Sequence, residues 1–202
     1  MKFKIFIPII LIIMINYISI TKCSSAIYIK FFGNEKIALS EKEIEKIIKL
    51  NKGKRPEPNT YLSYTYMKQH LLQFNDGISI IIGMEYYLKY TVYNNIIGRE
   101  DNTCFVMPTY ICDQIDVLYE NKIEMFEKIL NFPHGYFKKQ NGLVRLDIKN
   151  ISNLNLRIPS GNELGTNEYW IPGGYTIYGI PEAISDNIPL NKARIKIYYF
   201  TN

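Results

Sequence analysis

The stretch IPSGNELGTNEYWIPGGYTIYGIPEA, residues 158–183, brings together residue types that can hold and cleave a glycoside. It contains the carboxylate Glu182 and, before it, the aromatic side chains of Trp170 and Tyr175. An aromatic surface next to a carboxylate can hold a planar base or a sugar while a glycosidic bond breaks through a cationic, oxocarbenium-like transition state. We therefore predict that Glu182 is catalytic and that Trp170 and Tyr175 bind the ligand.

The same part of the chain contains candidates for binding a phosphate or diphosphate. Gly173 and Gly174 lack side chains, so a ligand can approach their backbone N–H groups closely. Arg145 and Arg157 precede them and can each offer two parallel hydrogen bonds to a phosphate. The sequence has neither a G-x-G-x-x-G stretch nor a P-loop, so neither a Rossmann fold nor an ATPase-type site is predicted.

Four stretches carry a resemblance to known proteins: TYLSYTYMKQHLLQFNDG, IGRED-TCFVMP, LVRLDI and RIPSGNELGTNEYWIPGG-T--GIPEAI. Together they resemble a type of C-terminal toxin domain found at the ends of large bacterial polymorphic and insecticidal toxins, over most of residues 60–189. The order of a strand arginine, a polar turn and a GG…PE end is also similar to the superfamily of ADP-ribosyltransferases and necrotising-toxin NAD glycohydrolases.

The second resemblance implies roles for three residues. Arg145 would bind an NAD phosphate, Ser160 would lie on the ribose side, and Glu182 would face the nicotinamide ribose as the catalytic acid. Two features depart from the pattern, because there is no Ser-Thr-Ser strand motif and Ile180 occupies the position two before Glu182. These departures favour NAD hydrolysis, or transfer to an acceptor other than arginine. NAD would be the substrate, a macromolecule could be the acceptor, and no metal is implied.

Two other functions are compatible with the same sequence. His70 and His134 could act as the acid and base of a secreted, metal-independent ribonuclease, because imidazole titrates near neutral pH. The aromatic loop could instead belong to a non-enzymatic extracellular module that recognises a glycan or a protein surface.

The N-terminus has the pattern of a secretory signal peptide over residues 1–25. Lys2 and Lys4 precede an apolar run from Ile5 to Ile15, and small residues follow. The alternative is an uncleaved anchor helix. Cleavage would remove three lysines and no acidic residue, so the formal charge of +5 would fall to +2. We predict a secreted protein without stable membrane association after cleavage and with no affinity for nucleic acid, except under the ribonuclease alternative.

The cysteines predict a disulfide more readily than a metal site. Cys104 and Cys112 are close in sequence, and an oxidising compartment would allow them to close a small loop. Without a CxxC motif, and with His70 and His134 far apart in the chain, the residues for a tetrahedral metal site are lacking.

Residues 26–202 are predicted to form a single α+β domain, in which a helical first half packs on a small, mainly antiparallel sheet formed largely by the second half. Ser40 with Glu43 forms a capping box before one helix, and Ser63 can cap the next. For MEYYLKY, residues 84–90, periodicity does not decide between helix and strand. Strands are expected at 143–148, 154–159 and 193–200.

Overall fold

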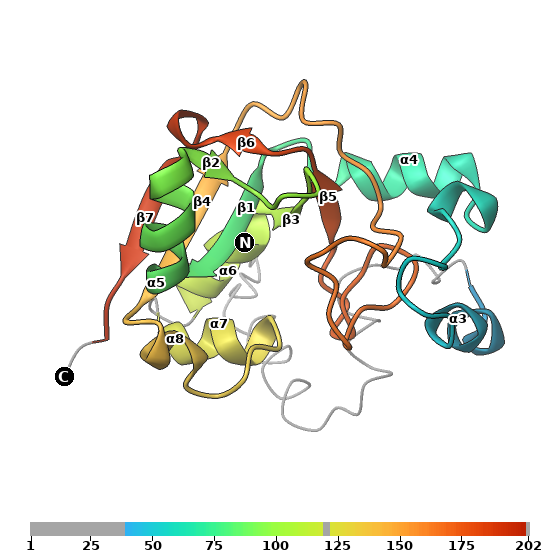
Figure 1. Cartoon of the computed structure of the whole chain (residues 1–202), viewed down its shortest axis with the longest axis horizontal. Helices are drawn as coiled ribbons and strands as arrows, with labels where there is room; N and C mark the ends of the chain where they lie inside the picture. The colour runs from blue at the N-terminus through green and yellow to red at the C-terminus, as the bar shows by residue number, and fades with distance from the viewer. Residues whose placement is uncertain (1–38, 119–121, 201–202) are drawn as a thin grey trace, which may run out of the picture.

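The computed structural model of the protein describes residues 39–118 and 122–200 of the 202-residue chain (Figure 1). The predicted signal peptide lies outside the described residues. The helices are α3 (Glu41–Ile48), α4 (Tyr64–Leu72), α5 (Met84–Tyr86), the π-helix η2 (Tyr87–Val92), α6 (Thr109–Leu118), α7 (Ile123–Ile129) and α8 (Tyr136–Lys139), with 3₁₀ turns η1 (Pro58–Thr60) and η3 (Leu190–Lys192). The strands are β1 (Ile78–Gly83), β2 (Ile96–Ile97), β3 (Cys104–Pro108), β4 (Leu143–Ile148), β5 (Ala183–Ser185), β6 (Ile188–Pro189) and β7 (Arg194–Tyr198).

The predicted α+β class is confirmed by a five-stranded sheet in the order β5-β3-β1-β4-β7, in which all neighbouring strands are antiparallel. Three of the five strands, β4, β5 and β7, come from the second half of the chain. Strands β2 and β6 form a separate two-stranded sheet. Residues 154–159, expected as a strand, instead form an irregular segment with one isolated bridge, between Arg157 and Ile184.

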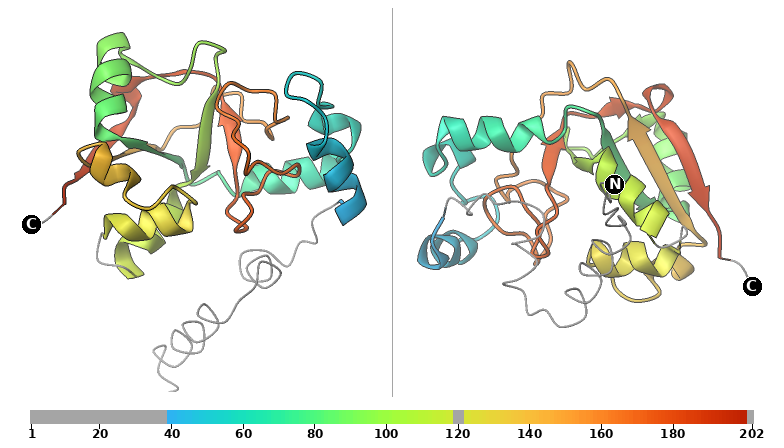
Figure 2. Two further views of the ribbon diagram at one scale, coloured as in Figure 1. Left: turned by 60° about the horizontal axis from the view of Figure 1, so that its bottom comes forward. Right: turned by 180° about the vertical axis from the view of Figure 1, so that it is seen from behind.

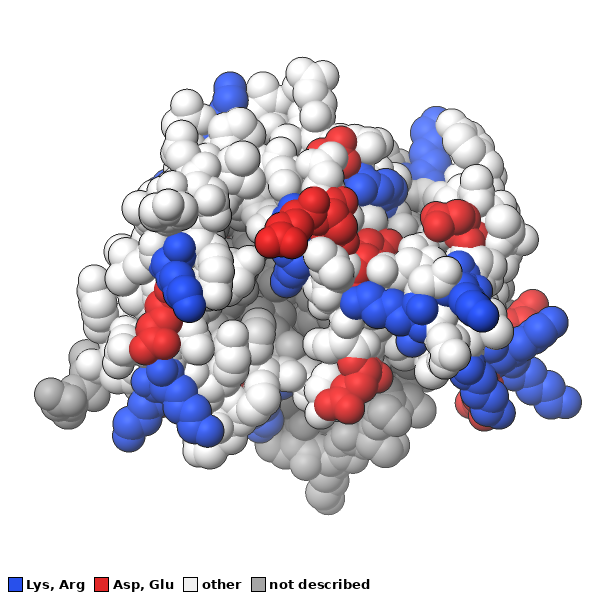
Figure 3. Space-filling model, in the orientation of Figure 1, with Lys and Arg blue, Asp and Glu red and all other residues white. Residues whose placement is uncertain are grey.

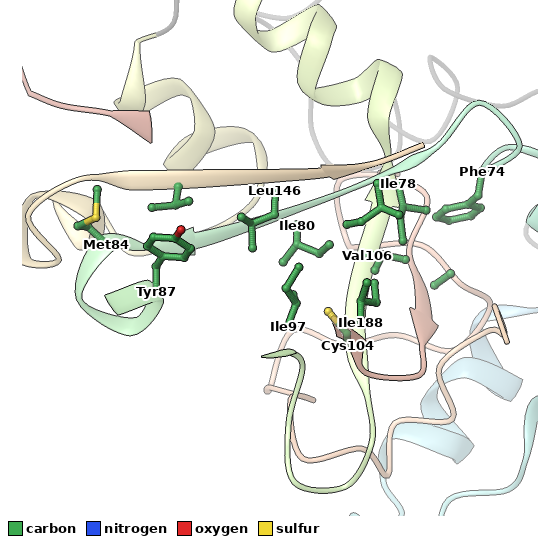
Figure 4. Close-up of a cluster of buried hydrophobic side chains, with 13 residues drawn as sticks. Phe74, Ile78, Ile80, Met84, Tyr87, Ile97, Cys104, Val106, Leu146 and Ile188 are labelled. Carbon is green, nitrogen blue, oxygen red and sulfur yellow. The ribbon is translucent and has the colours of Figure 1, made fainter. Parts of the chain in front are cut away.

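Both faces of the sheet are covered. On one face Val144 and Leu146 of β4 pack with Ile80, Met84 and Tyr87, beneath the helical turn of α5 and η2 (Figure 4). On the other face Leu143 packs with residues of α6, α7 and α8; in the rear view of Figure 2, α6 lies over the sheet, with α7 and α8 at its lower end. Side chains alternate between the two faces of a strand, and both faces of this sheet are covered. The side chains of β4 are therefore mostly buried on both faces, although its sequence contains the charged residues Arg145 and Asp147.

Local signals in the sequence place the first helices. The Ser40 hydroxyl accepts a hydrogen bond from the Glu43 backbone, and the Glu43 carboxylate accepts one from the Ser40 N–H, so the predicted capping box is confirmed. Ser63 likewise caps α4. Figure 1 shows α3 and α4 to one side of the sheet, with the loop 159–182 between them and the sheet.

The predicted disulfide is not formed, because Cys104 and Cys112 are free and lie in the clusters on opposite faces of the sheet. Cys104 belongs to β3 and Cys112 to α6, so the chain turns over the sheet between them. Burial raises the pKa of each thiol to about 12, which keeps both protonated and unreactive at neutral pH. Among the described residues, no helix is long and apolar enough to cross a membrane.

A buried ionic network joins β4, β7 and α6. Arg145, only 2% exposed, donates from Nε to Asp147 at 2.7 Å, from Nη1 to Asp116 at 2.8 Å, and from Nη2 to Asp113. Lys196 of β7 donates to Asp116 at 2.8 Å. Burial lowers the pKa of Arg145, but its hydrogen bonds to Asp147 and Asp113 outweigh this and raise it. The guanidinium is therefore held in the sheet by acceptors of the protein itself.

Replacing Arg145 with methionine is expected to reduce the free energy of unfolding by about 3–5 kcal/mol at pH 7, because carboxylates in and beside the core lose their main counter-charge. Urea denaturation of the mature chain measures this change. Arg194→Met on the exposed edge strand β7 is the matched control, with an expected change within about 0.5 kcal/mol. Equal stability of the two variants would contradict a structural role for Arg145.

Candidate active site

A small pocket with a cavity volume of about 80 Å³, partly open to solvent, lies between the sheet and the loop 159–182. The end of α7 forms one wall, the loop forms the opposite wall, and Phe105 comes from β3. Glu182, immediately before β5, also lines it. The lining residues are Phe105, Leu130, Asn131, Gly165, Thr166, Asn167, Tyr169, Trp170, Thr176, Ile177 and Glu182.

The backbone of Glu182 is fixed on both sides. Its N–H donates to the Gly174 carbonyl at 2.7 Å, and its carbonyl accepts a hydrogen bond from His70 Nε2 at 2.9 Å. The carboxylate, in contrast, has no hydrogen bond or ion pair with any described residue. Burial raises the pKa of Glu182 to about 7, and the charge of Glu163 adds to this rise. The result is a carboxyl group on a fixed backbone, with its pKa raised to about 7.

His70 holds the backbone of Glu182 in place through the hydrogen bond to its carbonyl. Its ring is fully buried and meets the Tyr175 ring edge-on, with centroids 4.8 Å apart. Burial lowers the pKa of His70, while its hydrogen bond to the Glu182 carbonyl has the opposite effect. Because a carbonyl can only accept, Nε2 must carry the proton of a neutral ring. A Cβ on Gly174 would come within 2.7 Å of Nε2, so the histidine requires a glycine at this position.

Two further polar atoms in the pocket have no partner. Trp170 Nε1 and Asn131 Nδ2 are buried, and neither forms a hydrogen bond with a described residue. Each can only donate, and leaving such a donor unpaired costs about 1–3 kcal/mol. Unpaired buried donors require an explanation, and a ligand with oxygen acceptors provides one. Trp170, Asn131 and Glu182, which carry these unpaired groups, all line the pocket.

The polar residues of the loop 159–182 mostly build its own structure. The Glu163 carboxylate accepts from the backbone N–H groups of Ser160 and Gly161, at 2.8 and 2.9 Å, and from the hydroxyls of Ser160 and Thr166. The Asn162 side chain bonds the backbone of Gly53 and Arg55, which ties the loop to the segment after α3. Ser160, predicted as a catalytic hydroxyl, thus has its hydroxyl bound to Glu163.

Of the predicted site residues, Glu182 and Trp170 lie in the pocket. The Trp170 indole is 5% exposed and packs beneath the Arg55 guanidinium, 4.7 Å from the ring centroid, so it does not offer an open face to a ligand. Gly173 and Gly174 are buried and do not line the pocket. The Gly173 carbonyl instead accepts from Tyr66 at 2.8 Å.

The other predicted ligand-binding residues have partners within the protein. Tyr175 accepts a hydrogen bond from Gln73 Nε2 at 3.0 Å and does not line the pocket. Arg157 pairs with Asp186 at 2.8 Å. Arg145 belongs to the ionic network of β4, so the structure does not bring it together with Glu182 in the pocket.

Sequence reasoning missed Asn131, Phe105 and Arg99. Asn131 follows α7 and has a left-handed backbone, with φ of 58°, for which an asparagine just after an apolar helix is a weak signal. Phe105 and Arg99 lie in the quoted IGRED-TCFVMP stretch, where no pattern distinguishes a pocket residue from a core or surface residue. The Arg99 guanidinium lies 5.8 Å from the centroid of the Phe105 ring.

The described part of the chain shows no metal site, and the face drawn in Figure 3 shows no basic stripe for nucleic acid. Among residues 39–118 and 122–200, no three His, Cys, Asp or Glu side chains come together as a metal site would require. Figure 3 shows basic side chains interspersed with acidic ones rather than arranged in a continuous stripe on this face.

The sequence matches no model of a known protein family and none of the curated proteins with which it was compared.

Replacing Glu182 with glutamine is expected to raise the free energy of unfolding at pH 8 by up to about 3 kcal/mol. The pKa of Glu182 is higher in the folded protein, about 7, than its ordinary value of 4.5, so its ionisation opposes folding as the pH rises between these values. The gain should therefore be present above pH 7 and vanish near pH 4. Denaturant titrations at pH 4 and pH 8 test this, and a gain of equal size at both would contradict it.

Proposed function

We propose that the protein is a secreted, toxin-like enzyme that cleaves the nicotinamide glycosidic bond of NAD, with Glu182 as the catalytic carboxylate. The observation that carries the proposal is the unpaired Glu182 side chain, whose pKa is about 7, in a pocket with two buried donors that lack partners. A carboxylate kept without a partner destabilises the fold, and such groups are characteristic of active sites.

The reaction breaks the bond between the ribose C1′ and the nicotinamide nitrogen. Nicotinamide leaves with the bonding electron pair as a neutral base, and positive charge develops on the ribose. The ionised Glu182 carboxylate stabilises this charge and accepts a hydrogen bond from a ribose hydroxyl. In hydrolysis, water then adds its oxygen to C1′, and the proton that it loses passes to Glu182 or to solvent.

The other pocket residues orient the substrate. Trp170 Nε1 and Asn131 Nδ2 would donate to oxygen atoms of the ribose or of the nicotinamide carboxamide, which would satisfy both buried donors. Tyr169, 47% exposed at the pocket, can cover the planar base. The partial opening of the pocket to solvent favours water as the acceptor, while a macromolecular acceptor at the opening would make the same chemistry an ADP-ribosyl transfer.

The ribonuclease alternative requires two histidines in one site. His70 is fully buried with Nε2 bound to the Glu182 carbonyl, whereas the His134 side chain is 95% exposed and lies 3.7 Å from Glu127. No contact joins them in the described part of the chain. The NAD proposal is favoured because the pocket contains Glu182 and neither histidine.

Incubating the refolded mature chain with NAD is expected to release free nicotinamide. The value of kcat/KM should increase with pH through about 7, because the reaction needs ionised Glu182 and the acid loses its proton in this range.

Glu182→Gln should reduce kcat about a hundredfold or more, while Glu168→Gln on the exposed part of the same loop should retain activity. Absence of nicotinamide release at any pH and at high enzyme concentration would refute the proposal, and ligand binding without turnover would favour a binding module.

Trp170→Phe separates the hydrogen bond of Nε1 from the packing of the ring. The phenyl ring can still pack against Arg55 and Gly161, but it offers no donor to the pocket. We expect the KM for NAD to rise about five- to tenfold, as for the loss of one hydrogen bond, with kcat little changed. Unchanged kinetics in a folded Trp170→Phe variant would show that Nε1 does not contact the substrate.

A further inference from the structure

Arg99 lies beside two lining residues of the pocket, Phe105 and Gly165. Its guanidinium lies over the Phe105 ring, and a Cβ added to Gly165 would come within 2.6 Å of the guanidinium carbon Cζ. Because Gly165 has no side chain, the Arg99 guanidinium can occupy the space next to its Cα. This contact places a permanent positive charge next to the pocket that contains Glu182.

The backbone of Arg99 is fixed by both of its polar groups. Its N–H donates to the Thr103 carbonyl at 3.0 Å and to Asn187 Oδ1 at 3.1 Å. Its carbonyl accepts from Asn187 Nδ2 at 2.8 Å and from the Asn102 N–H at 3.1 Å. The Arg99 side chain therefore starts from a fixed backbone position beside the pocket.

The guanidinium has no acceptor among the described residues. Arg145 and Arg157 are paired with carboxylates, whereas the charged group of Arg99 lies against the Phe105 ring and Gly165 and forms no ion pair with a described residue. The neighbouring acids do not neutralise it, because neither Glu100 nor Asp101 forms an ion pair with it, and Asp101 instead accepts from the Leu164 N–H at 2.7 Å. A half-buried guanidinium with five unused donors is a ready site for an oxyanion.

We propose that Arg99 is the anion-binding residue of this pocket and that its substrate carries a phosphoryl group there. The inference rests on the proposed function for the glycosidic half of the substrate, but not for the anion. The planar fork of arginine matches two oxygens of a phosphate, and its central carbon lies 5.8 Å from the centroid of the Phe105 ring. The pocket should therefore select a nucleotide over the corresponding nucleoside, and NAD over nicotinamide riboside.

Calorimetric titration of the mature chain with ADP tests this inference without turnover, because ADP has no nicotinamide bond to cleave. We expect ADP to bind at least tenfold more tightly than adenosine. Arg99→Gln should weaken ADP binding by about ten- to a hundredfold and leave adenosine binding unchanged. Arg194→Gln, which removes an exposed arginine on β7, is the matched control and should bind ADP as the wild type does.

Two further measurements keep the test decisive. Arg99→Lys retains the charge and the contact with Phe105, so it should fold even if the glutamine variant does not, and it should lose part of the ADP affinity because its ammonium lacks the fork. Adenosine-5′-carboxylic acid should bind more weakly than ADP, and tighter binding of this compound would assign the site to a carboxylate instead. Equal binding of ADP by the wild type, Arg99→Gln and Arg99→Lys would overturn the inference, whether or not NAD is cleaved.

Discussion

The candidate site depends on one constraint, which is that the irregular loop 159–182 must satisfy its backbone polar groups without a helix or a regular sheet. Glu163 meets much of this need by accepting from two backbone N–H groups and two hydroxyls, and Asn162 and Asp101 fix the loop to neighbouring segments. The polar residues that made the sequence resemble a ligand-binding loop thus form the wall of the pocket. Their bonds hold Trp170 and Glu182 in position around it.

Once these internal bonds are counted, few buried polar groups of the described residues are left without partners. Glu182, Trp170 and Asn131 line one pocket, although they come from different parts of the chain, whereas the unpaired hydroxyls of Tyr61 and Ser185 belong to residues outside it. The His70 and Gly174 bonds prevent the Glu182 backbone from moving to find a partner for its side chain. A fold under selection for stability alone has ready remedies for such groups, since a glutamine or a phenylalanine would remove the cost. Their persistence in one place argues for a ligand.

The sequence predicted the parts of this structure that depend on local interactions. The Ser40 and Ser63 caps, the strand 143–148 and the α+β class all follow from neighbouring residues or from a periodic pattern. Arg145 could not be interpreted in this way, because its role depends on Asp113 and Asp116 of α6, about thirty positions earlier in the chain. The separation of Cys104 and Cys112 could not be predicted from the sequence either, because it depends on how the chain turns from one face of the sheet to the other. Trp170 and Glu182, which the sequence predicts as site residues, both belong to this loop and line the pocket.

The arginines illustrate why tertiary contacts, rather than residue type, decide which cation is available to a ligand. Arg145 and Arg157 have carboxylate partners, so a ligand anion would have to displace a bonded acceptor before it could bind them. Arg99 has no such competitor among the described residues, and its charge lies beside a pocket whose carboxylate has a raised pKa.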